Sequence, residues 1–146
     1  AVGDCIDTFA YAHTAYTEGR IASHNTITGE AMTNTHITPS TIFSDPQVAT
    51  CGLNEKEAKR LGIEIDVKKA YFKANAKAKI LGDDSGFIKI ITSLPDKVVL
   101  GASIVGVEAV EIIHLLTAAV ERKVTLKELA GMIYAHPTIS ENIRHF

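Results

Sequence analysis

The sequence has 146 residues, 46% hydrophobic and 22% charged, which is the composition of an ordinary globular protein that can bury a core. Its net charge is −2, with basic and acidic side chains interspersed, so neither nucleic acid nor a membrane is indicated as a partner. The apolar runs are too short to span a bilayer. The two distant cysteines, Cys5 and Cys51, exclude a disulfide framework and are expected as free thiols in a reducing, cytoplasmic compartment.

The first predicted element is a helix over residues 9–26. Asp7 or Thr8 is expected as its N-cap, and Gly29 is expected to end it, because these residue types favour those positions. The polar, turn-rich stretch 33–39 that follows predicts a connection to the rest of the chain.

Short apolar segments separated by turn residues then predict a sheet. The expected strands cover residues 40–43, 47–53, 63–72, 87–91 and 98–104. Leu94-Pro95-Asp96 favours a tight turn, so the last two strands are expected to form an antiparallel hairpin. Asn54 followed three residues later by Glu57 predicts a capping box that opens a short helix, which Gly62 closes.

Three further helices are predicted, over residues 107–122, 125–132 and 138–146. The order of one helix, several strands and then helices predicts an α+β fold, in which helices cover one face of an antiparallel sheet.

The helix over 107–122 has an unusually wide apolar surface. Its polar members recur every three residues and are Glu108, Glu111, His114 and Thr117. We expect this surface to be too wide for one small sheet, and therefore to be buried against a second copy of the chain. Burial inside its own subunit is the alternative.

A histidine and a carboxylate near the end of the chain, His136 and Glu141, form the clearest candidate for chemistry. Pro137 disfavours helical geometry at His136 while its own φ suits a helix start, so His136 should precede a helix that carries Glu141 in its first turns. A nearby carboxylate fixes the tautomer of an imidazole and stabilises its protonated form. No nucleophile accompanies the pair, which indicates acid/base action on chemistry carried elsewhere. The alternative is that His136 only packs near the chain end.

The segment 136–141, His-Pro-Thr-Ile-Ser-Glu, resembles the C-terminal signature of the pyridine nucleotide-disulfide oxidoreductases, and within them that of the dihydrolipoamide dehydrogenases. The Gly3-Asp4 pair is similar to the element with which this family holds the FAD ribityl chain. Residues 10–13 stand where the family has Met-Leu-Ala-His, and residues 43–53 also look like a family segment. The resemblance thus extends along the chain in order.

The resemblance implies that residues 1–34 are the tail of an FAD-binding domain and that residues 35–146 are the C-terminal dimerisation domain. It implies a homodimer that uses FAD and NAD to oxidise a lipoyl-type dithiol. His136 matches the family's acid/base, Glu141 matches its carboxylate partner, and the His136–Pro137 peptide is expected to be cis.

The resemblance also implies a flavin-binding role for residues near the start of the chain. Asp4 would accept hydrogen bonds from ribityl hydroxyls. The N–H groups at the start of the first helix would face the flavin pyrimidine edge. The residues in that position are Ala10, Tyr11, Ala12 and His13.

Some parts of such an enzyme are absent from this sequence. It contains no G-x-G-x-x-G dinucleotide fingerprint and no closely spaced cysteine pair. We therefore expect a C-terminal piece of a larger enzyme that is inactive and does not bind FAD in isolation. No cluster of Cys and His has zinc-site spacing, so no metal is expected.

Alternative functions remain open at this stage. Residues 45–50 are also similar to mercuric reductase, and glutathione-type reductases carry a related motif with a second acidic residue where this chain has Asn142. Tyr134 stands where dihydrolipoamide dehydrogenases often have another histidine. A non-catalytic dimerisation or regulatory module is the alternative from another class, whereas a self-contained hydrolase would need a nucleophile that the sequence does not provide.

Overall fold

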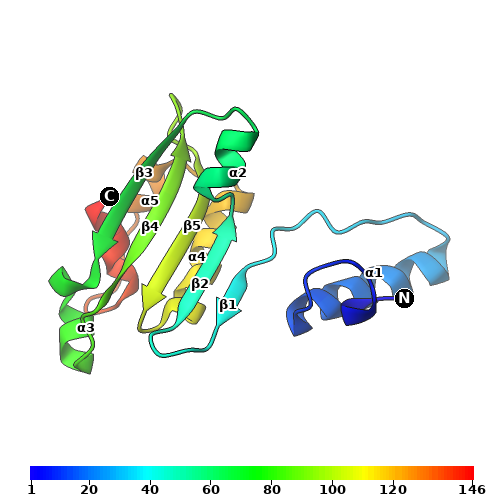
Figure 1. Ribbon diagram of the computed structural model, residues 1–146, viewed down its shortest axis with the longest axis horizontal. Coiled ribbons are helices and arrows are strands. Elements are labelled where there is room, and N and C mark those ends of the chain that lie inside the picture. The colour runs from blue at the N-terminus through cyan, green and yellow to red at the C-terminus, as the bar shows by residue number, and fades with distance from the viewer. The chain divides into compact units, whose positions relative to one another are not determined.

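The computed structural model describes all residues, 1–146, and divides into two compact units, Ala1–His36 and Ile37–Phe146 (Figure 1). None of the helices combines the length and the apolar character that a membrane-crossing helix needs.

The smaller unit contains a short 3-10 helix, η1 (Gly3–Cys5), and the 17-residue helix α1 (Ala12–Thr28). The expected helix is therefore present, and Gly29 ends it in a left-handed conformation with its N–H bonded to the Asn25 carbonyl, which confirms the predicted terminator. The predicted N-cap was wrong, because α1 begins at Ala12 and its N-cap is Tyr11, whose side chain makes no capping bond.

The late start of α1 follows from a contact between the preceding segment and the side of the helix. The Gly3 N–H donates to Glu18 Oε2 at 2.6 Å, so the chain before the helix folds back along its side. Gly3 has a φ of +70° and a Cβ added there would lie 3.1 Å from the Ala15 Cβ, a combination that favours glycine. Asp7 and Thr8 belong to this returning segment and cannot cap the helix.

The larger unit is built on a five-stranded sheet in which every neighbouring pair is antiparallel. Its strands are β1 (Ser40–Ile42), β2 (Val48–Gly52), β3 (Ile65–Tyr71), β4 (Gly86–Ser93) and β5 (Val99–Gly106). They lie in the order β1-β2-β5-β4-β3, and β4 and β5 form the predicted hairpin (Figure 1). The predicted α+β class with an antiparallel sheet is confirmed.

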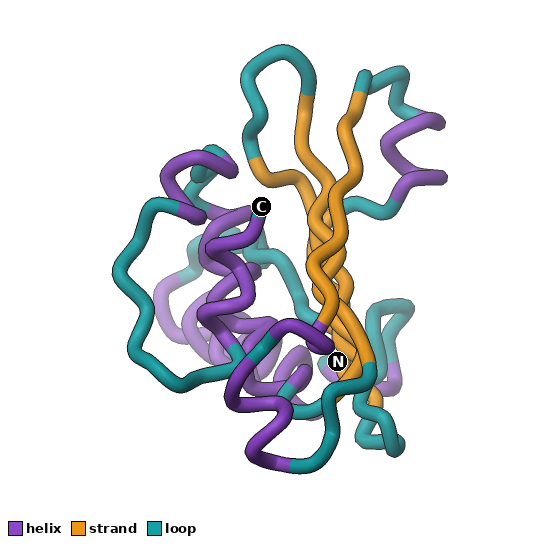
Figure 2. The backbone as a smooth tube through the Cα atoms, turned by 90° about the vertical axis from the view of Figure 1, so that its left-hand side faces the viewer, coloured by secondary structure: helices purple, strands orange, loops and turns teal.

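Helices lie on both faces of this sheet, and not on one face as expected. The helical segments are α2 (Glu55–Arg60), η2 (Phe72–Ala74), α3 (Ala76–Leu81), α4 (Ala109–Glu121), α5 (Leu126–Ala130) and η3 (Ser140–His145). Figure 2 shows most helices on one side of the sheet, with a short helix on the other. That helix is α2, which has the predicted Asn54–Glu57 capping box and is joined to β4 by a 2.7 Å ion pair between Glu55 and Lys89.

The helix α3 was not predicted. It has only six residues, too few to show a helical period, and its boundaries come from local signals. The Asn75 side chain accepts a hydrogen bond from the Ala78 N–H, and Gly82 ends the helix in a left-handed conformation.

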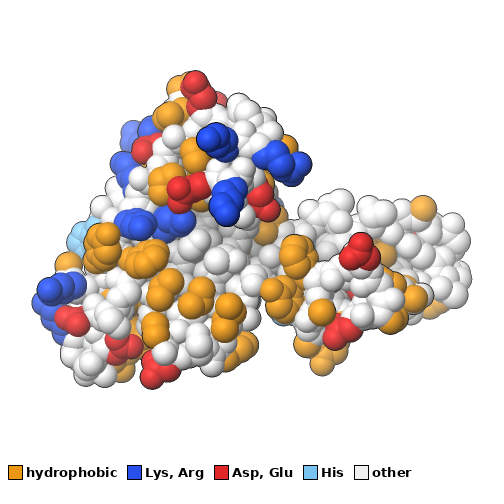
Figure 3. Space-filling view, in the orientation of Figure 1, with side chains coloured by type: hydrophobic (Ala, Val, Ile, Leu, Met, Phe, Trp, Pro, Cys, Tyr) orange, Lys and Arg blue, Asp and Glu red, His pale blue; other side chains and the backbone are white.

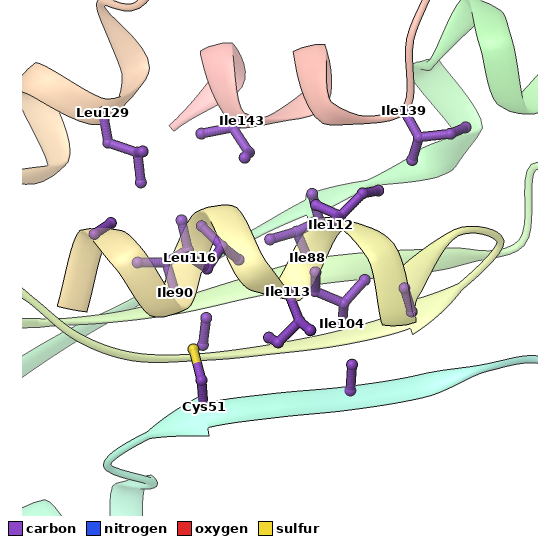
Figure 4. Packing of buried hydrophobic residues seen from close by; sticks show 14 of the residues in the cluster. Cys51, Ile88, Ile90, Ile104, Ile112, Ile113, Leu116, Leu129, Ile139 and Ile143 are labelled. Carbon is purple, nitrogen blue, oxygen red and sulfur yellow. The ribbon is translucent and has the colours of Figure 1, made fainter. Parts of the chain in front are cut away.

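The core explains where the apolar surface of α4 is buried. Ile113 and Leu116 of α4 belong to the same buried cluster as Ile88 and Ile90 of β4 and Ile104 of β5 (Figure 4). Each fully buried side chain of this size contributes about 1.5–3 kcal/mol to folding. One side of α4 is thus covered by its own sheet.

The opposite side of α4 is also covered within the unit. Leu129, Ile139 and Ile143 come from α5 and from the C-terminal segment, and they lie on the side of α4 that faces away from the sheet (Figure 4). The argument that only a second copy of the chain could bury this surface was therefore wrong, because the last residues of the same chain form a further layer over α4.

Candidate functional site

His136 and Glu141 meet near the end of the chain. The Nδ1 atom of His136 lies 2.9 Å from Oε2 and 3.1 Å from Oε1 of Glu141. His136 precedes η3 and Glu141 lies in its first turn, as the sequence predicted. The His136–Pro137 peptide bond is cis, which confirms another expectation.

Thr138 holds Glu141 in place through two reciprocal contacts. Its backbone N–H donates to Glu141 Oε1 at 3.3 Å, and its hydroxyl oxygen accepts from the Glu141 N–H at 3.3 Å. The hydroxyl itself donates to the Ala135 carbonyl at 2.7 Å. Sequence reasoning did not single out Thr138, although the spacing Thr-x-x-Glu is that of a capping box and could have indicated it.

The environment of the pair keeps the glutamate charged and the imidazole accessible. The His136 side chain is 70% exposed, whereas that of Glu141 is 10% exposed. The hydrogen bond from His136 is the largest cause that lowers the pKa of Glu141 below its ordinary value, and the Thr138 N–H and the nearby Arg144 act in the same direction. Glu141 is therefore a carboxylate at neutral pH, and since it engages Nδ1, the Nε2 atom of His136 is the nitrogen left for other partners.

Two asparagines fasten this segment to the rest of the unit. Asn75 Nδ2 donates to the Thr138 carbonyl at 3.0 Å. Asn142 is fully buried and donates from Nδ2 to the Ala70 carbonyl at 3.1 Å, while its Oδ1 has no partner. Neither contact could be predicted from the sequence, because each joins residues more than 60 positions apart.

A pocket of about 340 Å³ lies beside the pair. Its walls come from the α3 region and from the C-terminal segment, and are formed by Ala74, Asn75, Ala76, His136, Glu141, Arg144 and His145. The exposed imidazole thus borders a space that can admit a small group of a ligand.

The second set of predicted residues lies in the smaller unit. Asp4, in η1, is exposed and forms no hydrogen bond or ion pair. Tyr11 and His13 lie at the start of α1 with their rings stacked at 5.1 Å, and Ala10 and Ala12 flank Tyr11. Next to them is a group that the sequence analysis missed, Thr14, whose hydroxyl is buried without a hydrogen-bond partner.

The described residues favour neither a metal site nor a reactive Cys51 thiol. No three His, Cys, Asp or Glu side chains lie close enough to hold a metal ion. Burial raises the pKa of the Cys51 thiol, so this cysteine is protonated at neutral pH and poorly reactive.

The comparison with protein families agrees with the fold. Residues 38–146 match the model of the pyridine nucleotide-disulphide oxidoreductase dimerisation domain, and the chain belongs to this family. This confirms the family that the sequence motifs indicated.

The particular relatives are dihydrolipoyl dehydrogenases. The chain is 39% identical to the enzyme of Bacillus subtilis over 97% of this chain and 30% of that protein. It is 34% identical to dihydrolipoyl dehydrogenase 2 of Haloarcula marismortui over 98% of this chain and 30% of the relative. The chain therefore spans about a third of the length of the curated relatives that it matches.

Solved structures of disulfide reductases share the fold. LpdA from Mycobacterium tuberculosis matches 99% of this chain with a TM-score of 0.86 and 28% identity, and the match covers 33% of LpdA. RclA, an HOCl-induced flavoprotein disulfide reductase from Escherichia coli, matches all of the chain with a TM-score of 0.90. The identity to RclA is 24% and covers 34% of that protein, so this second likeness concerns the fold alone.

Proposed function

We propose that the chain is part of an FAD-dependent dihydrolipoyl dehydrogenase-like oxidoreductase, in which it supplies the dimer interface and the acid/base pair. The observation that carries this proposal is the bond between His136 and the shielded carboxylate of Glu141, at 2.9 Å, in a chain related to dihydrolipoyl dehydrogenases. In this proposal the protein is a cytoplasmic homodimer, a lipoyl-type dithiol is the substrate and NAD is the final acceptor.

The role of His136 follows from thiol–disulfide chemistry. A thiolate attacks a disulfide, so a base must remove the proton of the substrate thiol and later return a proton. The Nε2 atom of His136 accepts that proton, and Glu141 stabilises the resulting imidazolium and keeps Nδ1 as a donor. Such a base contributes about 10²- to 10⁴-fold to the rate. The disulfide itself belongs to another part of the assembly.

The smaller unit fits a role in holding FAD. Asp4 has an exposed carboxylate without partners, the start of α1 has no side-chain cap, and the buried Thr14 hydroxyl lacks a hydrogen-bond partner. In the proposal Asp4 binds ribityl hydroxyls, and the N–H groups at the start of α1 favour negative charge on the flavin. The cofactor would supply the transfer of electrons between dithiol and NAD.

In the proposal these residues form only a small part of a flavin site, and the NAD site lies outside this chain. The isolated chain should therefore be inactive and should not bind FAD. Titration of the isolated chain with FAD tests this statement, and micromolar binding would contradict it.

Two alternatives are less well supported. In Glu141 both carboxylate oxygens lie within hydrogen-bond distance of the exposed His136 imidazole, and the Thr138 N–H donates to one of them. A non-catalytic dimerisation module would have no need for this arrangement. A mercuric or glutathione-type reductase would share the fold, but the relatives with the identities given above are dihydrolipoyl dehydrogenases.

The test is to replace His136 by Gln in the intact parent enzyme. We expect kcat/KM for dihydrolipoamide with NAD to fall by about 10²- to 10⁴-fold. His114→Gln is the matched control, because His114 is an exposed histidine on α4 outside the pocket, and its activity should be unchanged. A loss of less than about threefold in His136→Gln would exclude the acid/base role.

A further inference from the structure

Asn75 joins the α3 region to the segment that carries His136 and Glu141. It lines the pocket beside that pair, and only 2% of its surface is exposed. Its Nδ2 atom donates to the Thr138 carbonyl at 3.0 Å, and its Oδ1 atom accepts from the Ala78 N–H at 2.9 Å. The two ends of one side-chain amide thus hold together two elements that are more than 60 positions apart in the chain.

Capping of α3 alone would not require an asparagine at position 75. Serine, threonine and aspartate also cap helices well, because each offers a side-chain oxygen. Among these residue types only asparagine also has an amide donor, which the Thr138 carbonyl accepts. The bond to Thr138 is therefore a second role of this side chain, in addition to the cap.

Thr138 is the residue that holds the Glu141 carboxylate. Its N–H donates to Glu141 Oε1 at 3.3 Å, and its hydroxyl oxygen accepts from the Glu141 N–H at 3.3 Å. Glu141 Oε2 in turn lies 2.9 Å from His136 Nδ1. A continuous series of hydrogen bonds thus runs from Asn75 through Thr138 and Glu141 to the imidazole.

This series begins at the core and ends at the surface. The Asn75 N–H donates to the Phe72 carbonyl at 2.7 Å, and Phe72 is fully buried in the core cluster. The His136 side chain, in contrast, is 70% exposed. In Figure 3 histidine atoms reach the surface at the left edge of the larger unit, between the places that α3 and the C-terminus have in Figure 1. An imidazole this exposed is oriented by its hydrogen-bond partners and not by packing around it.

We propose that Asn75 is a positioning residue for the acid/base pair, because its bond to the Thr138 carbonyl fixes the residue that holds Glu141 against His136. This inference rests on the proposed function of His136. The effect concerns the transition state, in which the imidazolium forms beside Glu141, and not the binding of the dithiol. Misplacement of a catalytic group by about 1 Å can cost about 10²-fold in rate, so the loss of this one bond should be measurable.

The experiment uses the intact parent holoenzyme with dihydrolipoamide and NAD. The test variant is Asn75→Ser, because serine can still cap α3 but is too short to reach the Thr138 carbonyl. The matched control is Gly82→Ala, which weakens the other end of α3. Gly82 has a φ of +74° and a Cβ there meets nothing within 4 Å, so the control strains only the backbone and leaves the Thr138 bond intact. Both variants are also made in a Glu141→Ala background.

We expect Asn75→Ser to lower kcat by about 10- to 10²-fold with KM unchanged, so that kcat and kcat/KM fall equally. Gly82→Ala should lower Tm but keep kcat and KM within about twofold of the parent values. In the Glu141→Ala background Asn75→Ser should cost less than about threefold in kcat, because the carboxylate that it positions is then absent.

Four results would overturn the proposal. A kcat of Asn75→Ser equal to that of the parent would show that the bond does not matter for the reaction. A raised KM with unchanged kcat would mean that Asn75 binds substrate, and an equal loss of kcat in Gly82→Ala would mean that α3 only supports the pocket. An undiminished loss in the Glu141→Ala background would mean that the effect does not pass through Glu141.

Failure of the proposed function would be recognised separately, in His136→Gln. If that variant kept the activity of the parent enzyme, the acid/base role would fail, and with it the role of Asn75. A strong loss in His136→Gln together with normal turnover by Asn75→Ser would remove the role of Asn75 alone.

Discussion

The two long helices of the chain, α1 and α4, are stabilised in opposite ways. In the 17-residue α1 Thr14 is the one buried residue, and apolar side chains such as Tyr16 and Ile27 are 76% and 80% exposed. In the 13-residue α4 seven residues are buried between the sheet and the C-terminal layer. Isolated helices of this length are marginal in water, and packing supplies most helix stability in proteins. The larger unit thus has its own core, whereas α1 lacks one.

The largest expected effect contrasts one core leucine with one exposed isoleucine. Leu116→Ala should lower the free energy of unfolding by about 2–5 kcal/mol, because it leaves a cavity between α4 and the sheet. Ile27→Ala removes an exposed side chain of α1 and should change it by no more than about 0.5 kcal/mol. Urea denaturation followed by circular dichroism measures both. Similar values for the two variants would break the contrast between the helices.

The next largest expected effect compares Gly101, in β5 of the larger unit, with Gly19, in α1. A Cβ at Gly101 would lie 2.1 Å from the Leu53 carbonyl oxygen, so Gly101→Ala forces strands apart and should cost up to about 3 kcal/mol. A Cβ at Gly19 of α1 meets nothing within 4 Å, so Gly19→Ala should favour the helix by about 0.5–1 kcal/mol. Thermal unfolding should show a lower Tm for the first variant, and helicity should rise in the second. A Gly101→Ala variant as stable as the parent would argue against the close strand packing.

The smallest effect concerns the two His–Glu pairs, one in each unit. The pKa of Glu141 is lowered mainly by its bond to His136, so the charged form favours the folded state. This stabilisation is complete above the ordinary glutamate pKa of about 4.3 and is lost as the pH falls through the lower folded pKa. Glu141→Gln should therefore reduce stability by less than about 1 kcal/mol at pH 7 and make no difference at pH 2.

The control for this measurement is the pair between His24 and Glu30. Its atoms are 2.6 Å apart, but both side chains are well exposed, at 41% and 64%. Exposed pairs contribute little to stability, so Glu30→Gln should leave the free energy of unfolding at pH 7 nearly unchanged. A steeper acid transition in Glu141→Gln than in the parent would reverse the sign argued here.

The sequence predicted the elements with strong local signals and missed those defined by distant contacts. The hairpin, the Asn54 capping box and Gly29 follow from residues within a few positions, and all three are confirmed. The start of α1 was wrong because Glu18 binds Gly3, fifteen positions away. The burial of α4 was misjudged because the covering layer comes from the last residues of the chain, and periodicity carries no information on what packs against a helix.

The contacts of the candidate site also fall into local ones, which the sequence could predict, and distant ones, which it could not. The contact of His136 with Glu141 could be predicted, since proline geometry and a spacing of five residues set it locally. Its attachment through Asn75 and Asn142 could not, because both bonds reach across the fold.

The bond from Asn142 to Ala70 has a consequence for association between chains. Ala70 belongs to β3, an outer strand of the sheet, and its carbonyl is occupied by a side chain of the same segment that holds Glu141. The other outer strand, β1, has only three residues, and Lys68 and Lys69 add charge to β3. Short, charged or covered edges disfavour strand pairing between molecules. The two edges thus disfavour extension of the sheet into a continuous intermolecular ladder.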